Sequence, residues 1–387
     1  MASQPPARRV WLAAAALLAV LILSAATARP VAAQPAGQHG RPVLPDEELL
    51  GTEHFLIHYT RTGRMAVEPT DLDGSAAPDY VERLAATLEY VWQVQIDELG
   101  WPAPPGDGFL GGDARLDVYL EDILTGGYAG YVDTEGGFLG DNPGTPEQER
   151  RAAFAYMVLD NDYREAESTY GETAMGLMQA TVAHEFNHAI QAGIDDHDLH
   201  AWLYEAAATW MEDQVYDDID DGIYYLNSLY KNPDICLVAE VARGDDLHWY
   251  SSWLLLQMMS ERYGPEVVRS IWENLRQYNG FGAVDAALAE HGSSLVLESR
   301  DFAVANLLRA YDEGHLYPTV RVEGEAAPGT FEPPDGVQSL GADYVRLAGS
   351  GLLTVTLASL DASLSLRAVG VRGGEADVYD AIGGGRP

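Results

Sequence analysis

The chain has 387 residues, with 60 acidic against 23 basic side chains and a formal net charge of −37 at pH 7. Nucleic acids and anionic membrane surfaces repel so acidic a protein, which excludes the common modes of binding to either. Cys236 is the single cysteine, so no internal disulfide can form and the fold must depend on a hydrophobic core, on bound ions, or on both. The length suits one large domain or two smaller ones.

The first 33 residues have the features of an export signal. Arg8 and Arg9 precede an apolar run from Val10 to Leu23, and small residues follow up to Ala33. We expect residues 1–33 to be a cleaved signal peptide, 34–48 a flexible leader, and the mature protein to be secreted or extracytoplasmic without stable membrane association. An uncleaved N-terminal membrane anchor is the alternative, because the apolar run approaches the roughly 20 residues that span a bilayer.

The part of the chain that follows combines both kinds of secondary structure, and its N-terminal half contains the strands. His54 and His58 belong to the first of these strands and are interpreted as surface or packing residues, since they are too far apart to bind one metal ion. The patterns predict strands at 54–59, 116–120 and 153–160, a helix at 78–99, and a glycine-rich and aromatic-rich connection at 126–140.

A run of oxygen-bearing side chains lies just before the first helix. Counted from Asp71, they fall at positions 1, 3, 5, 9 and 12, which is the ligand spacing of an EF-hand calcium loop: Asp71, Asp73, Ser75, Asp79 and Glu82. The glycine expected at position 6 is Ala76, and no helix precedes the loop. The run is therefore interpreted either as a calcium site or as an acidic turn that caps the helix.

Residues 174–191 have the apolar period of one amphipathic helix, and this helix contains the sequence His-Glu-Phe-Asn-His. His184 and His188 are four residues apart and so lie on the same helical face. Two imidazoles one turn apart can bind one zinc ion, and Glu185 can then act as general base toward a water on that metal. A catalytic zinc site needs a third protein ligand.

A second helix is predicted at 202–213, after a short loop, and it places Glu205 seventeen residues beyond His188. The helix-loop-helix is long enough to fold Glu205 back over the two histidines. Glu212 is two turns further on nearly the same face and is the alternative third ligand. The metzincin pattern fails, because Gln191 and Ile194 occupy the positions of its glycine and third histidine.

With its second helix reading Trp-Leu-x-Glu-Ala, this motif resembles the gluzincin metallopeptidases, in particular secreted bacterial members of the thermolysin-like clan. The resemblance implies a zincin-like α+β fold over about residues 50–315, zinc bound by His184, His188 and Glu205, and peptide or protein substrates. It also implies that the strand at 153–160 edges the cleft, and that a helix near the zinc begins with a tyrosine. Tyr250, and after it His248, are therefore candidates for stabilising the oxyanion.

The rest of the chain is mostly helical up to residue 318. Residues 216–245 look irregular and acidic, which favours a solvated loop and leaves a second ion site as the alternative. Helices are predicted at 248–263, 266–277, 283–290 and 295–311, and short strands at 319–322, 344–347, 352–357 and 364–369. We assign 49–318 to the catalytic domain and 319–387 to a β-rich C-terminal appendage.

These observations predict a secreted zinc-dependent metallopeptidase in which Glu185 takes a proton from the attacking water and returns it to the leaving amine. An extracellular binding or adhesion protein with a catalytically silent zincin-like domain is the alternative. Zinc-dependent hydrolysis of a non-peptide substrate also fits the motif.

Overall fold

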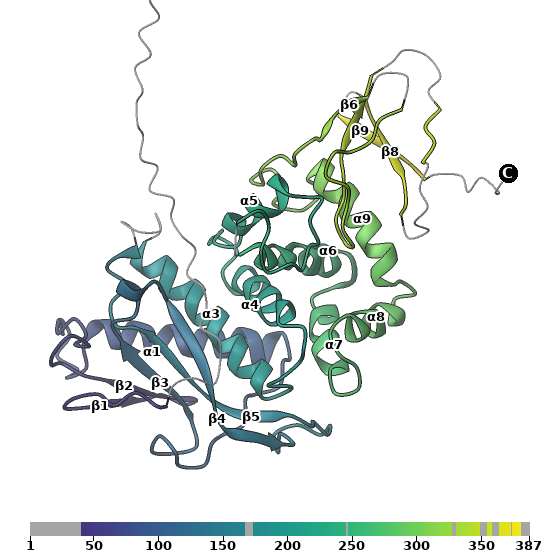
Figure 1. Cartoon of the computed structure of the whole chain (residues 1–387). Coiled ribbons are helices and arrows are strands. Elements are labelled where there is room, and N and C mark those ends of the chain that lie inside the picture. Colours follow the sequence, from purple (N-terminus) through teal and green to yellow (C-terminus); the bar gives the residue numbers. More distant parts are fainter. Residues whose placement is uncertain are drawn as a thin grey trace, which may run out of the picture.

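The protein has an α+β fold, seen in a computed structural model that describes residues 40–166, 173–244, 247–326, 330–348, 354–357, 364–372 and 374–380. A five-stranded sheet with two long helices forms one half of the molecule, and a group of helices forms the other (Figure 1). The expected signal peptide lies outside the described residues. Within those residues, no helix is long and apolar enough to cross a membrane.

The sheet has the strand order β1-β2-β3-β5-β4. β2 and β3 are parallel, as are β3 and β5, whereas the two outer strands β1 and β4 run antiparallel to their neighbours. The predicted strands at 54–59, 116–120 and 153–160 are confirmed. The strands are β1 (Glu48–Gly51), β2 (Phe55–Tyr59), β3 (Leu116–Glu121), β4 (Gly130–Gly140) and β5 (Ala152–Asp160).

The edge of the sheet differs from the sequence prediction in two ways. The segment at 126–140 is not only a connection, because most of it forms β4, which is preceded by a short 3₁₀ helix, Leu124–Gly126. β5 is an inner strand between β3 and β4, so the prediction that it lies at the edge is wrong, and β4 is the edge strand. The glycines of this segment lower its strand propensity, so the sequence pattern did not predict a strand. Backbone pairing with β5 overrides this low propensity.

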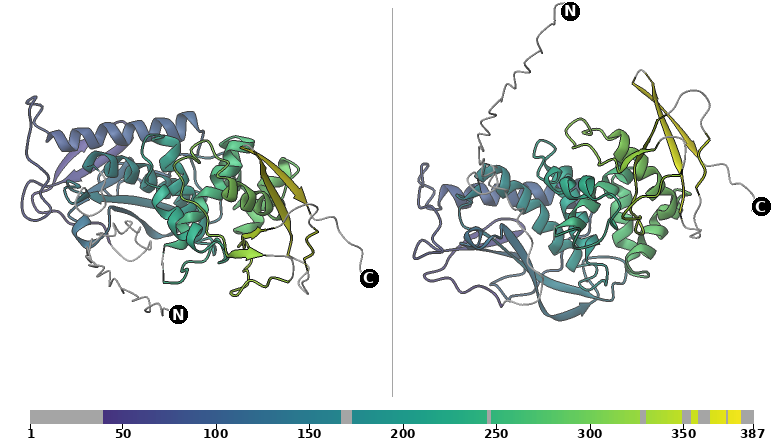
Figure 2. Two further views of the ribbon diagram at one scale, coloured as in Figure 1. Left: turned by 90° about the horizontal axis from the view of Figure 1, so that it is seen from above. Right: turned by 45° about the horizontal axis from the view of Figure 1, so that its top comes forward.

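Two helices cover one face of the sheet (Figure 2). α1 (Asp79–Trp92) continues as a π-helix (Gln93–Glu98), which confirms the predicted helix at 78–99. α3 (Ala174–Ala192) begins after Thr173, whose side chain accepts a hydrogen bond from the Gly176 amide at 3.0 Å and caps the helix. His54 and His58 are packing residues as predicted: His54 stacks on Trp92, and His58 is buried against Asp117.

The opposite face of the sheet is closed by the segment that precedes β1. The Arg41 guanidinium there contacts the carboxylates of Asp107, Asp117 and Glu135 and lies over the ring of Tyr156. Asp117 is fully buried. Since a buried carboxylate is costly without a partner, Arg41 is what allows these acidic side chains to lie inside the fold.

The second half of the molecule is helical. The segment at 216–245 was predicted to be irregular but contains α5, because its apolar residues Leu226, Leu229 and Tyr230 recur at helical spacing and are buried. The predicted helix at 248–263 begins as a 3₁₀ turn and ends at Gly264, whose φ of 96° favours glycine. The elements are α4 (Trp202–Val215), α5 (Ile223–Lys231), the 3₁₀ helix (His248–Ser252), α6 (Trp253–Tyr263), α7 (Glu266–Asn274), α8 (Phe281–Glu290) and α9 (Leu295–Leu308).

The C-terminal part has two pairs of short strands, and the predicted strands at 344–347 and 364–369 are confirmed in part, at 345–347 and 367–372. Residues 319–322 and 354–357 form no strand, and residues 352–353 lie outside the described residues. The segment between α9 and β7 packs on the helices, since Tyr344 donates to the Ala303 carbonyl and Arg321 donates its amide to the Tyr230 carbonyl. The strands are β6 (Gly324–Ala326), β7 (Val345–Leu347), β8 (Arg367–Arg372) and β9 (Glu375–Asp380).

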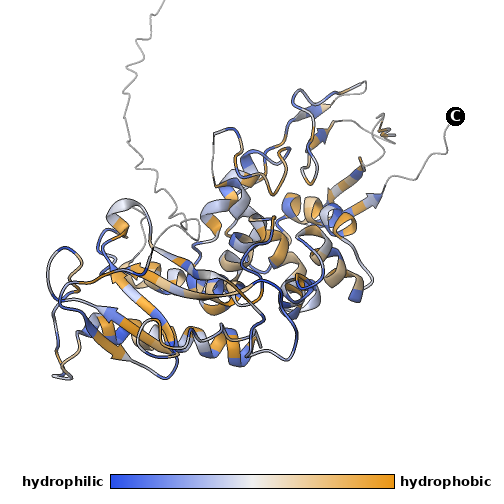
Figure 3. Ribbon diagram, turned by 60° about the horizontal axis from the view of Figure 1, so that its bottom comes forward, coloured by the Kyte–Doolittle hydropathy of each residue, from blue (hydrophilic) through white to orange (hydrophobic). Residues whose placement is uncertain are grey.

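One continuous hydrophobic core joins the sheet half to the helical half. Phe55 of β2 contacts Phe186 of α3, and α3 in turn packs on α4. Apolar residues concentrate in the strands and on the inward faces of the helices, while the loops are mostly hydrophilic (Figure 3). Because α3 and α4 meet in the middle of this core, side chains on their facing surfaces are held in a rigid environment.

We predict that Gln95→Ala destabilises the protein by about 1–3 kcal/mol. Gln95 is fully buried, donates to the Ala183 carbonyl of α3 at 2.8 Å, and accepts from the Asn187 amide at 3.2 Å. Denaturant unfolding of both forms measures the loss. Gln93→Ala in the same π-helix is the matched control, because Gln93 bonds only to the exposed Glu98, and an equal effect of both substitutions would contradict the prediction.

Candidate metal centre

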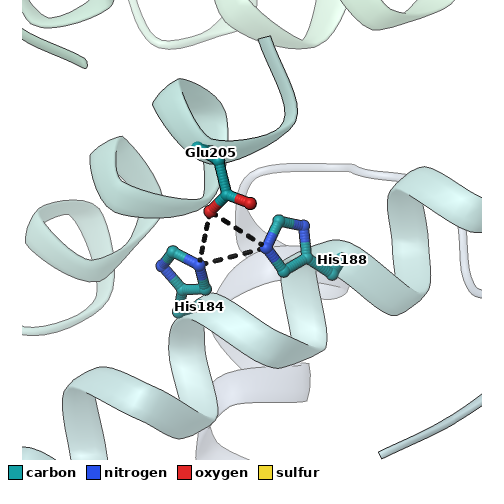
Figure 4. A group of neighbouring side chains, drawn as sticks. All are labelled: His184, His188 and Glu205. Atoms are coloured by element: carbon teal, nitrogen blue, oxygen red, sulfur yellow. Dashed lines mark hydrogen bonds and ion pairs between the residues drawn. The ribbon is translucent and has the colours of Figure 1, made fainter. Parts of the chain in front are cut away.

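The two histidines of the sequence motif face each other on α3. His184 and His188 are one turn apart, and their Nε2 atoms are 3.0 Å from each other (Figure 4). Both side chains are largely buried, with 9% and 12% of their surface exposed. The helix therefore presents two imidazole nitrogens at one point inside the molecule, as the spacing predicts.

α4 brings the predicted third residue to the same point. Oε2 of Glu205 lies 3.4 Å from His184 Nε2 and 3.6 Å from His188 Nε2 (Figure 4). Ligand atoms around a tetrahedral zinc ion at 2.0–2.1 Å are about 3.3 Å apart. The observed separations of 3.0–3.6 Å match that spacing, so the three side chains are arranged to hold a metal ion.

Hydrogen bonds to the outer nitrogen of each ring, Nδ1, determine which tautomer that ring adopts. His184 Nδ1 donates to Glu212 Oε1 at 2.5 Å, and His188 Nδ1 donates to Gln191 Oε1 at 2.7 Å. With the proton on Nδ1, each Nε2 of a neutral ring carries a lone pair. Together with Glu205 Oε2, three acceptor atoms thus converge with no donor between them. This arrangement is the one that metal-binding histidines use, with a hydrogen-bond partner on the other nitrogen.

The partner of His188 is itself held by a chain of directed hydrogen bonds. Gln191 donates its amide to Asn187 Oδ1 at 2.7 Å and to the Tyr204 carbonyl at 3.1 Å, which turns its oxygen toward His188. Asn187 then donates to Gln95. The orientation of the His188 ring is therefore set by residues of the π-helix, α3 and α4.

The charges around the site favour a cation at its centre. Burial opposes a charged His184, but hydrogen bonds to Glu205 and Glu212 raise the pKa of its imidazole well above the ordinary value. Burial also opposes a charged Glu205, but the neighbouring His188 and His184 lower the pKa of that carboxyl far below its usual range. The surroundings thus stabilise a positive charge between the rings, whether a proton or a divalent ion supplies it.

Glu212, the alternative third ligand, has a different place in the structure. Its carboxylate contacts Nδ1 of His184, on the side of the ring away from His188 and Glu205. Burial raises the pKa of Glu212, and the hydrogen bond to His184 opposes this rise. Glu212 therefore orients the His184 ring and does not take part in the three-atom group.

Glu185 points into a small pocket beside the three-atom group. The pocket is lined by residues of α3 and α4 and by residues at or just before the starts of β4 and α5: Ala129, Gly130, Leu177, Thr181, His184, Glu185, Glu212, Asp221 and Tyr225. Among the residues that the structure describes, the buried Oε2 atom of Glu185 has no hydrogen-bond partner, and burial raises the pKa of this carboxyl. A buried carboxylate with a free oxygen beside a metal centre is suited to accept a proton.

The edge strand approaches Glu185 closely because its first residue is glycine. A Cβ atom at Gly130 would lie 2.8 Å from Glu185 Cγ and 2.7 Å from Thr181 Cγ2. Any other residue at this position would push β4 away from α3. The side chain of the candidate base is thus held between a helix and the edge of the sheet.

Tyr225 is a residue of the pocket that the sequence analysis missed. Burial, together with Asp221 and Glu212, raises the pKa of its phenol well above the ordinary value, so the hydroxyl keeps its proton and can donate a hydrogen bond. It was missed because the acidic residues before it made 216–245 look like a loop. The helical spacing of Tyr225, Leu226 and Leu229 was the available signal.

The two predicted oxyanion donors lie next to Tyr225. Tyr250 stacks on the Tyr225 ring with centroids 4.7 Å apart. His248 is fully buried, and its Nδ1 is 2.9 Å from the Ser228 hydroxyl. Neither residue is among those that line the pocket with His184 and Glu185.

The predicted calcium loop is brought together only in part. Carboxylate oxygens of Asp71, Asp73 and Asp79 lie within 4.8 Å of one another, but the Glu82 carboxylate is not in this group. Both Asp71 oxygens accept backbone amides of the loop, and Asp79 Oδ1 accepts the Leu72 amide. The acidic side chains therefore stabilise the turn itself.

Comparison with known proteins assigns no function to this arrangement. Residues 170–279 match DUF6055, a family of unknown function. The matched segment includes α3, α4 and α5, and with them His184, His188, Glu205 and Tyr225. No curated protein matches the chain.

We predict that Glu205→Ala loses bound zinc, whereas Glu212→Gln keeps it with an affinity about 10–100-fold lower, because Glu212 acts through the His184 ring. Elemental analysis gives the zinc content, and competition with a chelator gives the affinity. His54→Ala serves as control, since His54 stacks on Trp92 in the sheet half. Equal zinc loss in the Glu205 and Glu212 variants would show that Glu212 is a ligand after all.

Proposed function

We propose that this protein is an exported zinc-dependent metallopeptidase of the gluzincin type with a zincin-like fold. The observation that carries the proposal is the convergence of His184 Nε2, His188 Nε2 and Glu205 Oε2 at ligand spacing, beside the buried carboxylate of Glu185. A purely structural metal site has no use for an unpartnered carboxylate at its side. The apolar run at 10–23 supports export.

The donor set fits zinc. Two neutral imidazoles and one carboxylate are the ligands of a known class of catalytic zinc site, which leaves the fourth position open. A zinc ion held there would polarise the substrate carbonyl and make water more acidic. The three side chains need no rearrangement to hold it, because their spacing already matches.

Glu185 is the residue that moves protons. As water attacks the carbonyl carbon, the carboxylate accepts a proton from the water at its free oxygen. It then donates this proton to the nitrogen of the leaving amine as the C–N bond breaks, which returns Glu185 to its starting state. Burial and the neighbouring carboxylates of Glu205 and Glu212 raise the pKa of Glu185, which brings its basicity closer to what proton transfer near neutral pH requires.

Tyr225 is the best-placed donor for the oxyanion that forms when the carbonyl carbon becomes tetrahedral. It lines the pocket with His184 and Glu185, and its raised pKa keeps the phenol protonated. Stacking with Tyr250 fixes the ring plane. A donor held in place before the reaction lowers the barrier more than one that must reorient.

The edge strand supports a peptide as substrate. Within the described part of the chain, β4 is an edge strand that pairs only with β5, so its other edge can accept an extended chain. Its first residue lies against Glu185, so a peptide added along β4 would pass the metal centre. Backbone pairing of this kind holds a peptide with little regard to its sequence.

We predict that Glu185→Gln keeps one zinc ion per chain and lowers the rate of peptide cleavage by at least about 100-fold, since the amide cannot accept the proton. Cleavage of a mixed peptide library by the zinc-loaded secreted form tests this, with mass spectrometry of the products. Zinc content is measured on the same samples. No cleavage by either form, with zinc bound, would contradict the peptidase proposal and favour a non-peptide substrate or a silent binding protein.

We predict that Tyr225→Phe lowers kcat by about 100-fold with little change in KM, because the hydroxyl acts only on the transition state. Tyr224→Phe is the matched control: it is the preceding residue, and its side chain is partly exposed. Tyr250→Phe is assayed alongside, and a larger loss there than in the Tyr225 variant would return the role to Tyr250.

A further inference from the structure

Tyr163 has an unusual backbone conformation for a buried aromatic residue. It lies in the turn after β5 with a φ of 51°, in the left-handed region that large side chains rarely adopt. Among the described non-glycine residues with positive φ it is the only buried one, and its exposed fraction is 0%. Strain of this kind persists only where the surroundings enforce it, and it is often found at functional sites.

The conformation is enforced by the buried carboxylate of Asp160, the last residue of β5. Its Oδ1 atom accepts the amides of Asp162 and Tyr163, at 3.0 and 2.7 Å. Its Oδ2 atom accepts the amides of Ile123 and Leu124, at 3.0 and 2.8 Å, where the 3₁₀ helix before β4 begins. One side chain thus ties the turn after β5 to the turn that leads into β4, and these hydrogen bonds offset the cost of the left-handed backbone.

The phenol of Tyr163 holds the beginning of the edge strand. Its hydroxyl donates a hydrogen bond to the Ala129 carbonyl at 2.9 Å, and the same carbonyl accepts the Asp160 amide at 3.1 Å. Burial raises the pKa of this phenol well above its ordinary value, so the hydroxyl stays protonated and remains a donor. Ala129 directly precedes β4 and lines the pocket of Glu185, whereas Tyr163 is not among the lining residues. Tyr163 therefore acts on this pocket through Ala129.

The strand that Tyr163 holds lies close against the candidate base. A Cβ atom at Gly130 would be 2.8 Å from Glu185 Cγ and 2.7 Å from Thr181 Cγ2. Since α3 carries both Glu185 and Thr181, the place of Ala129 decides how near the Gly130 backbone comes to the Glu185 side chain.

We propose that Tyr163 is a positioning residue for peptide hydrolysis: through the Ala129 carbonyl, its hydroxyl fixes the distance between the beginning of β4 and Glu185. The inference rests on the proposed peptidase function, in which a substrate chain pairs along β4 and Glu185 takes a proton from water. A substrate placed by β4 meets that water in a reactive geometry only if the distance is kept, and a displacement of about 1 Å can lower a rate about 100-fold. Without the hydroxyl, the Asp160 amide alone among the described residues holds the Ala129 carbonyl.

Tyr163→Phe tests this inference, because it removes one oxygen atom and leaves the ring in place. In the zinc-loaded secreted form, kcat for a peptide substrate should fall about tenfold or more, with zinc content unchanged. KM should change little, because only the beginning of β4 is released. An unchanged kcat, measured well below the Tm, would overturn the inference and leave the peptidase proposal intact, whereas no cleavage by the wild type would overturn both.

Tyr344→Phe is the matched control for the loss of a buried hydrogen bond. The Tyr344 hydroxyl also donates to a backbone carbonyl at 2.9 Å, that of Ala303, in the C-terminal part of the chain. This variant should show a similar fall in Tm and the kcat of the wild type. An equal loss of kcat in both variants would show that Tyr163 acts through stability alone, and would overturn the inference.

Gly130→Ala displaces the same strand by a different means, since the added methyl group has no room beside Thr181 and Glu185. It should lower kcat, and an unchanged kcat would overturn the inference whatever the stability of Tyr163→Phe. The double variant should be little slower than the slower single variant, because a strand that is already displaced cannot lose the same contact twice. Losses of kcat that multiply would show that the two residues act independently, and would also overturn the inference.

Discussion

Three buried acceptor atoms held within 3.6 Å of one another impose the constraint on which the rest of the structure depends. Lone pairs repel at this distance, so the fold must hold the two imidazoles and the carboxylate in place from outside. Glu212 and Gln191 do so by fixing the outer nitrogens of the rings. The fully buried Ala206 and Ala207 contribute by letting α4 pack closely in the core.

α4 has polar side chains on two faces. Glu205 and Glu212 are two turns apart and face the histidines, while Thr209 and Asp213 are among the residues that line a pocket near Asp220 and Glu313. Electrostatic contacts therefore hold the helix on the side of the histidines, in addition to its apolar contacts with α3 and α6.

Much of the candidate centre could be predicted because its determinants are local. The spacing of His184 and His188 fixes a shared face in any helix, and the apolar period around Glu205 predicts the second helix. The role of Glu212 could not be read in the same way, because helical spacing does not say on which side of an imidazole a carboxylate lies. The presence of Tyr225 in the pocket could not be predicted either, because it depends on how α5 packs against α3 and α4 in the folded protein.

The fold was predictable to the extent that hydrophobic patterns are strong. The long helices and the inner strands β2, β3 and β5 follow their apolar runs closely. β4 is rich in glycine and lies at the edge of the sheet, so neither its composition nor its burial gave a clear signal. The short strands after α9 are likewise exposed over much of their length, and pairing decides where they form.

The contacts of Arg41 bear on the order in which the chain folds. Its partners Asp107, Asp117 and Glu135 are 66, 76 and 94 residues further along the chain. Contacts of such long range form only after the elements that carry them have come together, so we expect the segment before β1 to dock last. Until then, the buried carboxylates lack their counter-charge, and assembly of the sheet and closure of its second face become a single cooperative step.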